Sequence, residues 1–361
     1  MDISEVDKNF QLAPLSEPDI EWFDANDPRF SLHGVFYDEA EGLYRRMPNA
    51  VAETVNFGVK GLCRHTAGGR LRFRTNSPYV AVKCITAPDY VMAHMPAQGS
   101  HGFALYTGGI FAGKYSATVS EFIEAAKDNY RDMAIEGLCY FKTQSMDAEL
   151  YFPLYNGVRH LYIGLKKGSD ILPPTPYKFP KPLVFYGSSI TQGGCASHPG
   201  NDYISLLSRR LNFDFVNLGF SGSAKGEPTM RAYLADLDAS VFVLDYDYNA
   251  PNAEYLKQTH YPLYKEIRDK NPDTPIVFIS KPDFYEGNLQ DSIDRRKVII
   301  ANYEKAKADG DTNVYFIDGE TLFGTDGRDG CTVDNCHPND LGFYRMATTI
   351  EPVLREILAK L

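Results

Sequence analysis

The feature that most constrains this fold is one stretch, Pro182-Leu-Val-Phe-Tyr-Gly-Ser-Ser-Ile-Thr-Gln-Gly-Gly194. It begins as an apolar run and then breaks into glycines and the two serines Ser188 and Ser189. A short apolar run bounded by glycine predicts a buried central strand of a parallel sheet. Ligands of open α/β sheets bind at the carboxyl ends of the strands, so both serines are expected at such an edge. A Ser-Ser turn alone is more often a local hydrogen-bonding turn, so the remaining chain must decide its function.

Strand and helix signals alternate throughout the chain after residue 182. This alternation predicts a flavodoxin-like, doubly wound parallel sheet of five strands. The predicted strands are 183–187, 213–219, 241–246, 275–280 and 314–319, and the predicted helices are 203–211, 255–270, 291–309 and 339–361.

Residues before about 175 follow a different pattern. Short segments with period-two alternation recur between turn residues, which predicts an all-β sandwich of the jelly-roll kind. These segments are 55–59, 69–75, 79–85, 102–106, 138–141, 149–152 and 160–165. The proline-rich stretch 168–182 cannot continue a sheet and separates the two patterns. We therefore expect a β-sandwich domain over 1–175 and an α/β domain over 176–361.

Composition excludes several classes of function. The net charge of −10, with scattered basic residues, argues against a nucleic-acid partner. No apolar run reaches the roughly 18 to 20 residues needed to span a bilayer, so no membrane association is expected. Residues 1–7 are acidic where a signal peptide would be basic and then apolar. This favours the cytoplasm, or the periplasm or exterior if a signal has been removed; the oligomeric state is not predicted.

The six cysteines are too few and too dispersed for a disulfide scaffold. Cys331 and Cys336 flank a short motif, and Cys336 precedes His337, so zinc is one reading of this segment. No Cys-x-x-Cys pair or second histidine at ligand spacing accompanies them, and we predict no metal site. A local disulfide between the two cysteines stays open.

The residues that could carry chemistry follow the ends of the predicted strands. They are Ser189, Gly222, Asn249, Asp334 and His337. Strand ends of one parallel sheet share an edge, so these residues should converge. Acyl transfer needs a nucleophile, a base, a carboxylate that orients the base, and donors for an oxyanion. The sequence supplies all four.

In this order, the serine, glycine, asparagine and histidine blocks resemble those of the SGNH (GDSL-type) hydrolases. The resemblance covers about residues 180–361 and is closest to the branch with an N-terminal β-sandwich, which often carries Gly-Ser-Ser-Ile-Thr followed by Gly-Gly-Cys-Ala-Ser. Gly42-Leu-Tyr-Arg45 matches another motif of that branch in altered form. The resemblance implies a triad of Ser189, His337 and Asp334, and an oxyanion hole formed by Ser189, Gly222 and Asn249.

Three alternatives stay open within this assignment. The family's Gly-Asp-Ser reads Gly187-Ser-Ser189 here, so Ser188 is the alternative nucleophile. Asp247 could face the site in place of Asn249 if the turn is shifted. The Asp334-x-x-His337 pair could be only a helix cap. The other seven histidines, His94 among them, lack such neighbours in the sequence and are expected at the surface or in the core.

The expected function is a serine esterase that removes short acyl groups, acetyl in the first place, from carbohydrate. The acyl-transfer chemistry follows from the residues, whereas the carbohydrate follows from what the resemblance implies. No metal or organic cofactor is required, and the partner would be an acylated carbohydrate or another small ester. The alternatives are a lysophospholipase or thioesterase, which should carry an apolar lid, and a non-catalytic carbohydrate-binding protein.

Overall fold

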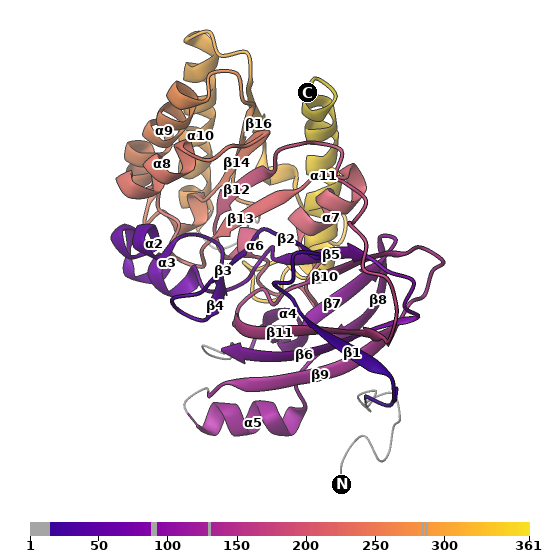
Figure 1. Ribbon diagram of the computed structural model, residues 1–361. Coiled ribbons are helices and arrows are strands. Elements are labelled where there is room, and N and C mark those ends of the chain that lie inside the picture. The colour runs from indigo at the N-terminus through magenta and orange to yellow at the C-terminus, as the bar shows by residue number, and fades with distance from the viewer. Residues whose placement is uncertain (1–14, 88–91, 129–130, 283–284, 286–287) are drawn as a thin grey trace.

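The computed structural model describes residues 15–87, 92–128, 131–282, 285 and 288–361. The acidic segment 1–7, on which the expected localisation rests, lies outside the described residues. The first half of the chain forms two antiparallel sheets, and the second half forms a parallel sheet between helices (Figure 1). Within the described residues, no helix combines the length and apolarity needed to cross a membrane.

The first half is a β-sandwich, as the alternating pattern predicts. A four-stranded antiparallel sheet has the order β1, β11, β6, β9, and a five-stranded antiparallel sheet has the order β2, β5, β10, β7, β8. Alternate side chains of both sheets, such as Val80, Val82, Leu71 and Phe73, meet in one buried core. The strands of the two sheets are β1 (Ile20–Asp24), β2 (Ser31–His33), β5 (Arg70–Arg74), β6 (Tyr79–Ala87), β7 (Phe103–Thr107), β8 (Ile110–Tyr115), β9 (Met133–Tyr140), β10 (Asp147–Tyr151) and β11 (Gly157–Lys166). Two short strands, β3 (Phe36–Asp38) and β4 (Leu43–Arg45), form a separate antiparallel pair.

One predicted segment of the sandwich is wrong. Residues 55–59 do not form a strand but lie at the junction of helices α2 (Asn49–Val55) and α3 (Phe57–Leu62). The Asn56 side chain accepts the Val59 N–H and so begins α3. Apolar residues at Val55, Val59 and Leu62 fit the helical period better than the strand period. Two more helices accompany the strands, α4 (Ala97–His101) and α5 (Val119–Lys127).

The second half is the predicted doubly wound sheet. Its parallel strands have the order β13, β12, β14, β15, β16, which is the flavodoxin-like order 2-1-3-4-5. Successive residues of β12 point to opposite faces: Leu183 and Phe185 join the core with α7 and α11, and Val184 and Tyr186 join the core with α8, α9 and α10. The strands are β12 (Leu183–Gly187), β13 (Phe215–Gly219), β14 (Val241–Asp245), β15 (Ile276–Ile279) and β16 (Val314–Ile317). The covering helices are α7 (Tyr203–Leu211), α8 (Pro228–Ala235), α9 (Ala253–Lys270), α10 (Leu289–Ala308) and α11 (Asp340–Leu358).

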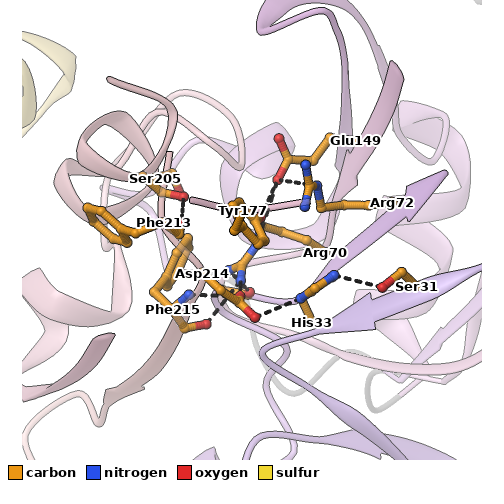
Figure 2. Close-up of polar contacts among 12 residues, drawn as sticks. Ser31, His33, Arg70, Arg72, Glu149, Tyr177, Ser205, Phe213, Asp214 and Phe215 are labelled. Atoms are coloured by element: carbon orange, nitrogen blue, oxygen red, sulfur yellow. Dashed lines mark hydrogen bonds and ion pairs between the residues drawn. The ribbon is translucent and has the colours of Figure 1, made fainter. Parts of the chain in front are cut away.

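The two halves share a buried polar interface. Arg70 on β5 has no exposed surface and donates to the backbone carbonyls of Gly68 and Phe215, at 2.6 and 3.0 Å. Its guanidinium lies 3.6 Å from the centre of the Phe215 ring and pairs with the Asp214 carboxylate (Figure 2). The other oxygen of that carboxylate lies 2.8 Å from Nδ1 of His33. This cluster anchors the sandwich at the start of β13, and the ranges 1–175 and 176–361 remain our proposed domains.

Candidate active site

Ser189 begins a one-turn helix, α6 (Ser189–Gln192), directly after the central strand β12. Two glycines allow this turn to lie so close to the strands. A Cβ on Gly187 would lie 2.0 Å from Oγ1 of Thr191, and a Cβ on Gly219 would lie 2.2 Å from the backbone nitrogen of Gln192. The helix therefore starts at the very edge of the sheet.

Ser189 and His337 are in direct contact. Their Oγ and Nε2 atoms are 2.8 Å apart, and Nδ1 of the same ring lies 2.7 Å from Oδ2 of Asp334. An ionised carboxylate can only accept a hydrogen bond, so the ring proton belongs on Nδ1. The lone pair of Nε2 then faces the serine hydroxyl, which is the arrangement that a general base requires.

Asp334 holds the loop as well as the imidazole. Its Oδ1 accepts the backbone N–H groups of His337 and Cys336, at 2.7 and 3.2 Å. Burial raises the pKa of Asp334, but the hydrogen bonds from the backbone and ring of His337 outweigh it and leave that pKa below its ordinary value. The helix-cap hypothesis for Asp334 is wrong, because α11 is capped by Asn339, whose side chain accepts the N–H groups of Leu341 and Gly342.

Gly222 and Asn249 lie at the two neighbouring strand ends. Gly222 has a φ of +65°, which favours glycine, and no atom would lie within 4 Å of a Cβ there. Asn249 ends the 3₁₀ turn η2 (Asp247–Asn249), and its amide donates to the Phe220 carbonyl at 2.7 Å. Asn249 thus braces the loop that carries Gly222, and a second N–H of the amide is left to donate. Their part in an oxyanion hole stays a prediction.

The two alternative site residues are occupied elsewhere. Ser188 is fully buried, and its hydroxyl accepts the N–H of Ile190 at the start of α6. Asp247 is buried as well, and its Oδ2 accepts the backbone N–H of Lys281 at 3.0 Å. Burial raises the pKa of Asp247 to about 6 despite that bond and the nearby Arg295 guanidinium. Neither side chain contacts the imidazole of His337 in the described part of the chain.

The sandwich half supports the glycine loop from behind. Arg46 is buried and donates to the carbonyls of Asn217 and Gly219, at 3.0 and 2.6 Å, where β13 runs into this loop. The amide of Asn56 donates to the Ser223 carbonyl at 2.9 Å. Sequence reasoning missed both residues, although Arg46 directly follows the Gly42-Leu-Tyr-Arg45 motif.

The sandwich also contacts the nucleophile helix. The Tyr155 hydroxyl donates to the Ser189 carbonyl at 3.1 Å, and the Leu154 carbonyl accepts from the Gln192 side chain at 3.1 Å. The same Gln192 amide accepts the N–H of Ser221 at 3.1 Å and so links α6 to the glycine loop. Both strand-end segments are therefore fixed from one side by the first half of the chain.

His94, expected only at the surface or in the core, lies beside the site. It precedes α4 in the first half, yet its ring centre lies 5.3 Å from that of His337. Its Nε2 lies 4.0 Å from Oδ2 of Asp334. Cys195, just after α6, is buried and has a φ of +75°, a rare conformation for a residue with a side chain. All six cysteines of the chain, Cys331 and Cys336 included, are free thiols in the structure.

Comparisons with known proteins agree with this architecture. Residues 180–355 match the GDSL-like lipase/acylhydrolase family, and residues 20–171 match the family described as the N-terminus of SGNH hydrolase-type esterases. No curated protein sequence matches the chain.

Three solved structures resemble the whole molecule. A protein described as a GDSL-like lipase from Bacteroides ovatus is 30% identical, with a TM-score of 0.80 over 94% of this chain and 98% of that one. The salicylyl-acyltransferase SsfX3 from a tetracycline biosynthetic pathway is 22% identical, with a TM-score of 0.74 over 95% and 98%. A family two carbohydrate esterase from Clostridium thermocellum is 14% identical, with a TM-score of 0.60 over 92% and 99%. The last two likenesses concern the fold alone.

Proposed function

The chain belongs to the GDSL-like lipase/acylhydrolase family of SGNH hydrolases, and on that premise we propose that it is a serine esterase that removes short acyl groups, chiefly acetyl, from carbohydrates. One observation carries the proposal. Two hydrogen bonds of 2.8 and 2.7 Å connect Ser189 through His337 to Asp334.

The reaction follows from these contacts. Nε2 of His337 takes the hydroxyl proton as Oγ of Ser189 attacks the ester carbonyl, and Asp334 stabilises the imidazolium that forms. The imidazolium then gives the proton to the ester oxygen of the sugar as its bond to the carbonyl carbon breaks, which releases the sugar alcohol and leaves an acyl-enzyme on Ser189. Water, deprotonated by the same imidazole, attacks this second ester, releases the short acid and returns the proton to Ser189.

The oxyanion of each tetrahedral intermediate would accept hydrogen bonds from three donors. We assign the backbone N–H groups of Ser189 and Gly222 and the second N–H of the Asn249 amide. Removal of one such donor costs about 3 to 4 kcal/mol in comparable sites. The bond from Asn249 to Phe220 supports this assignment, because it keeps the amide beside the loop without using both of its protons.

The short acyl group is inferred from the loop beside the nucleophile. Gly193-Gly-Cys-Ala196 consists of small residues, and a Cβ on Gly194 would lie 3.1 Å from the Ser189 carbonyl and 3.3 Å from Cε of Met95. Carbohydrate as the leaving group is supported by the likeness to the family two carbohydrate esterase. SsfX3, which this chain resembles in fold, is a salicylyl-acyltransferase. Transfer of the acyl group to an acceptor hydroxyl, in place of water, is therefore the alternative reaction to test.

Hydrolysis of p-nitrophenyl esters of increasing acyl length, beside an acetylated xylo-oligosaccharide, tests this proposal. Each added methylene changes the free energy by which a pocket discriminates between two acyl groups by about 1 to 3 kcal/mol. We therefore expect kcat/KM to fall about tenfold or more from acetyl to butyryl, and octanoyl esters to be inert. Ser189→Ala is the blank for every substrate.

Three outcomes would contradict the proposal. Rates that stay flat or rise towards octanoyl would favour a lysophospholipase or thioesterase. An acyl group that is moved to an added alcohol faster than to water would favour an acyltransferase. A protein that binds the oligosaccharide but releases no acid, and whose Ser189 is not labelled by a fluorophosphonate, would be a non-catalytic carbohydrate-binding protein.

A further inference from the structure

Three side chains with soft or borderline ligand atoms meet beside Ser189. They are His94 from the sandwich half, Cys195 from the loop after α6, and His337 from the loop before α11. Their ligand atoms all lie within 4.8 Å of one another. We propose that these three residues form a binding site for a divalent transition cation of the Zn²⁺ type, and that an ion bound there switches the enzyme off.

The donor set matches this class of ion. Imidazole nitrogen and thiolate sulfur are the ligands that Zn²⁺ selects, at about 2.0 to 2.1 Å and 2.3 Å, whereas Mg²⁺ and Ca²⁺ prefer oxygen. A tetrahedral ion with these bond lengths holds its ligands about 3.3 to 3.6 Å apart. The three groups must therefore approach by about an ångström. His94, whose side chain is one-third exposed, is the one with room to move.

His337 is already prepared as a ligand. Asp334 fixes the proton on Nδ1, so Nε2 keeps its lone pair. A carboxylate behind a metal-binding histidine is the common arrangement in zinc sites. Nε2 also faces Ser189, so an ion on this atom takes the base that would deprotonate the serine. An ion on Nδ1 would instead separate the imidazole from Asp334, with the same consequence.

Cys195 supplies the thiol. Its left-handed backbone, with φ of +75°, is an unusual conformation, and such conformations cluster at functional sites. Burial and then the charge of Asp334 raise the pKa of Cys195 to about 12, so the free enzyme holds the neutral thiol. Binding replaces the S–H bond by a bond to the ion and releases one proton to solvent, with no change of oxidation state. The fourth position would be held by water, as in zinc sites with three protein ligands.

Cobalt binding tests the site without any need for turnover. Chelator-treated protein titrated with Co²⁺ should develop tetrahedral visible bands and a sulfur-to-cobalt charge-transfer band in the near ultraviolet, with one equivalent bound. Cys195→Ala should lose the charge-transfer band. His94→Ala should weaken Co²⁺ binding at least about tenfold. Cys336→Ala and the exposed His160→Ala are the matched controls and should leave binding unchanged.

Inhibition by Zn²⁺ is the second arm, and it alone rests on the proposed esterase function. We expect the Zn²⁺ concentration for half-inhibition to rise at least about tenfold in His94→Ala and in His94→Gln, with each variant compared with its own uninhibited rate. The site is overturned if wild-type protein gives no charge-transfer band, or if Cys195→Ala keeps it. A retained cobalt site with unchanged Zn²⁺ inhibition in both His94 variants would overturn the switch. The cobalt titration needs no esterase activity, so it tests the metal site even if the proposed function is wrong.

Discussion

Ser188 and Ser189 show how little separates a catalytic from a structural hydroxyl. The two residues are adjacent, but Ser188 caps α6 and has no exposed surface, whereas Ser189 is 7% exposed and touches the imidazole. A strand that ends in a turn of helix presents only one of two successive side chains to the sheet edge. The sequence alone could not choose between them, because two adjacent serines follow Gly187 and either could be aligned with the serine of the family's Gly-Asp-Ser.

Ser189→Ala should abolish ester hydrolysis and labelling by a fluorophosphonate probe, with a midpoint of thermal unfolding close to that of the wild type. Its hydroxyl contributes little packing. Ser188→Ala is the matched control: it should keep the labelling but lose about 1 kcal/mol of stability, because it removes a helix cap. Labelling of the Ser189 variant at the wild-type rate would transfer the role of nucleophile to Ser188.

Asp247 should make stability depend on pH in an unusual direction. Its folded-state pKa of about 6 lies above the ordinary value near 4, so the folded protein binds the proton more tightly than the unfolded chain. Its contribution to stability is present in full below about pH 4 and is lost as pH rises to about 6, by roughly 2 to 3 kcal/mol.

Urea unfolding at pH 4, 5, 6 and 7 measures this effect. The free energy of unfolding of Asp247→Asn, relative to the wild type, should rise by that amount between pH 4 and 7. Carboxyl groups that do not interact with Asp247 titrate in both proteins and cancel in the difference. The difference therefore reports on Asp247 together with Asp245, whose pKa is raised by burial and by the Asp247 charge. Asp326→Asn, at an exposed position, should show no such trend. A difference that stays constant with pH would mean that Asp247 is ionised throughout.

At the level of helices and loops, the sequence predicts best those elements whose hydrophobic pattern is long and regular. The five strands of the parallel sheet and the helices α7, α9, α10 and α11 were predictable because long apolar runs alternate with amphipathic stretches. The short helix α8 begins at Pro228 and gave no comparable signal. The strand prediction for residues 55–59 is wrong because Val55, Phe57 and Val59 alternate as in a strand, whereas the helical spacing of Val55, Val59 and Leu62 determines the structure.

The site was predictable only in part, for a reason of topology. Ser189, Gly222, Asn249 and His337 follow strand ends, and parallel strands bring their ends to one edge. His94, Arg46 and Tyr155 come from a different sheet far away in the sequence. No periodic pattern reports how a sandwich docks on a neighbouring domain.

Arg46 allows a test of whether the sandwich prepares the glycine loop for catalysis. It carries hydrogen bonds to the carbonyls of Asn217, Gly219 and Leu62. Arg46→Met keeps the apolar bulk but removes these charged bonds, which contribute about 1.5 to 3 kcal/mol each. We expect a lower melting temperature and a fall in kcat of about tenfold or more, with KM almost unchanged, because only the oxyanion would lose preorganised donors.

Arg45→Met is the matched control for this prediction. Arg45 is equally buried but pairs with Asp38 and Glu41 of the sandwich half. Its loss should lower stability and leave kcat near the wild-type value. Equal kcat losses in the two variants would mean that Arg46 acts through stability alone.

At the level of the whole molecule, the contacts argue for one cooperative unit. Residues of α2 and α3, which belong to the sandwich half, share a core with α8 of the other half. Arg70, Arg46 and Tyr155 each join the first half to a strand end or to α6 of the second. Arg46 and Tyr155 thus support segments of the active site from the interface, and Arg70 holds the start of β13. Separation of the halves would disturb the active site before either sheet unfolds.

Arg70→Met tests this coupling with two probes that report on different halves. Trp22, the only tryptophan, lies on β1 of the sandwich, so its fluorescence follows the first half. Esterase activity follows the second half. Removal of the buried Arg70 leaves the half-buried Asp214 with His33 and the Phe215 N–H, and loss of a buried ionic partner costs up to about 3 kcal/mol. Both probes should therefore melt together in the wild type and shift down together in the variant. Arg74→Met, on the same face of β5 but partly exposed, should shift neither by much. A fall of the fluorescence transition alone, with activity lost at the wild-type temperature, would show that the sandwich unfolds separately and that the interface cluster does not couple the two halves.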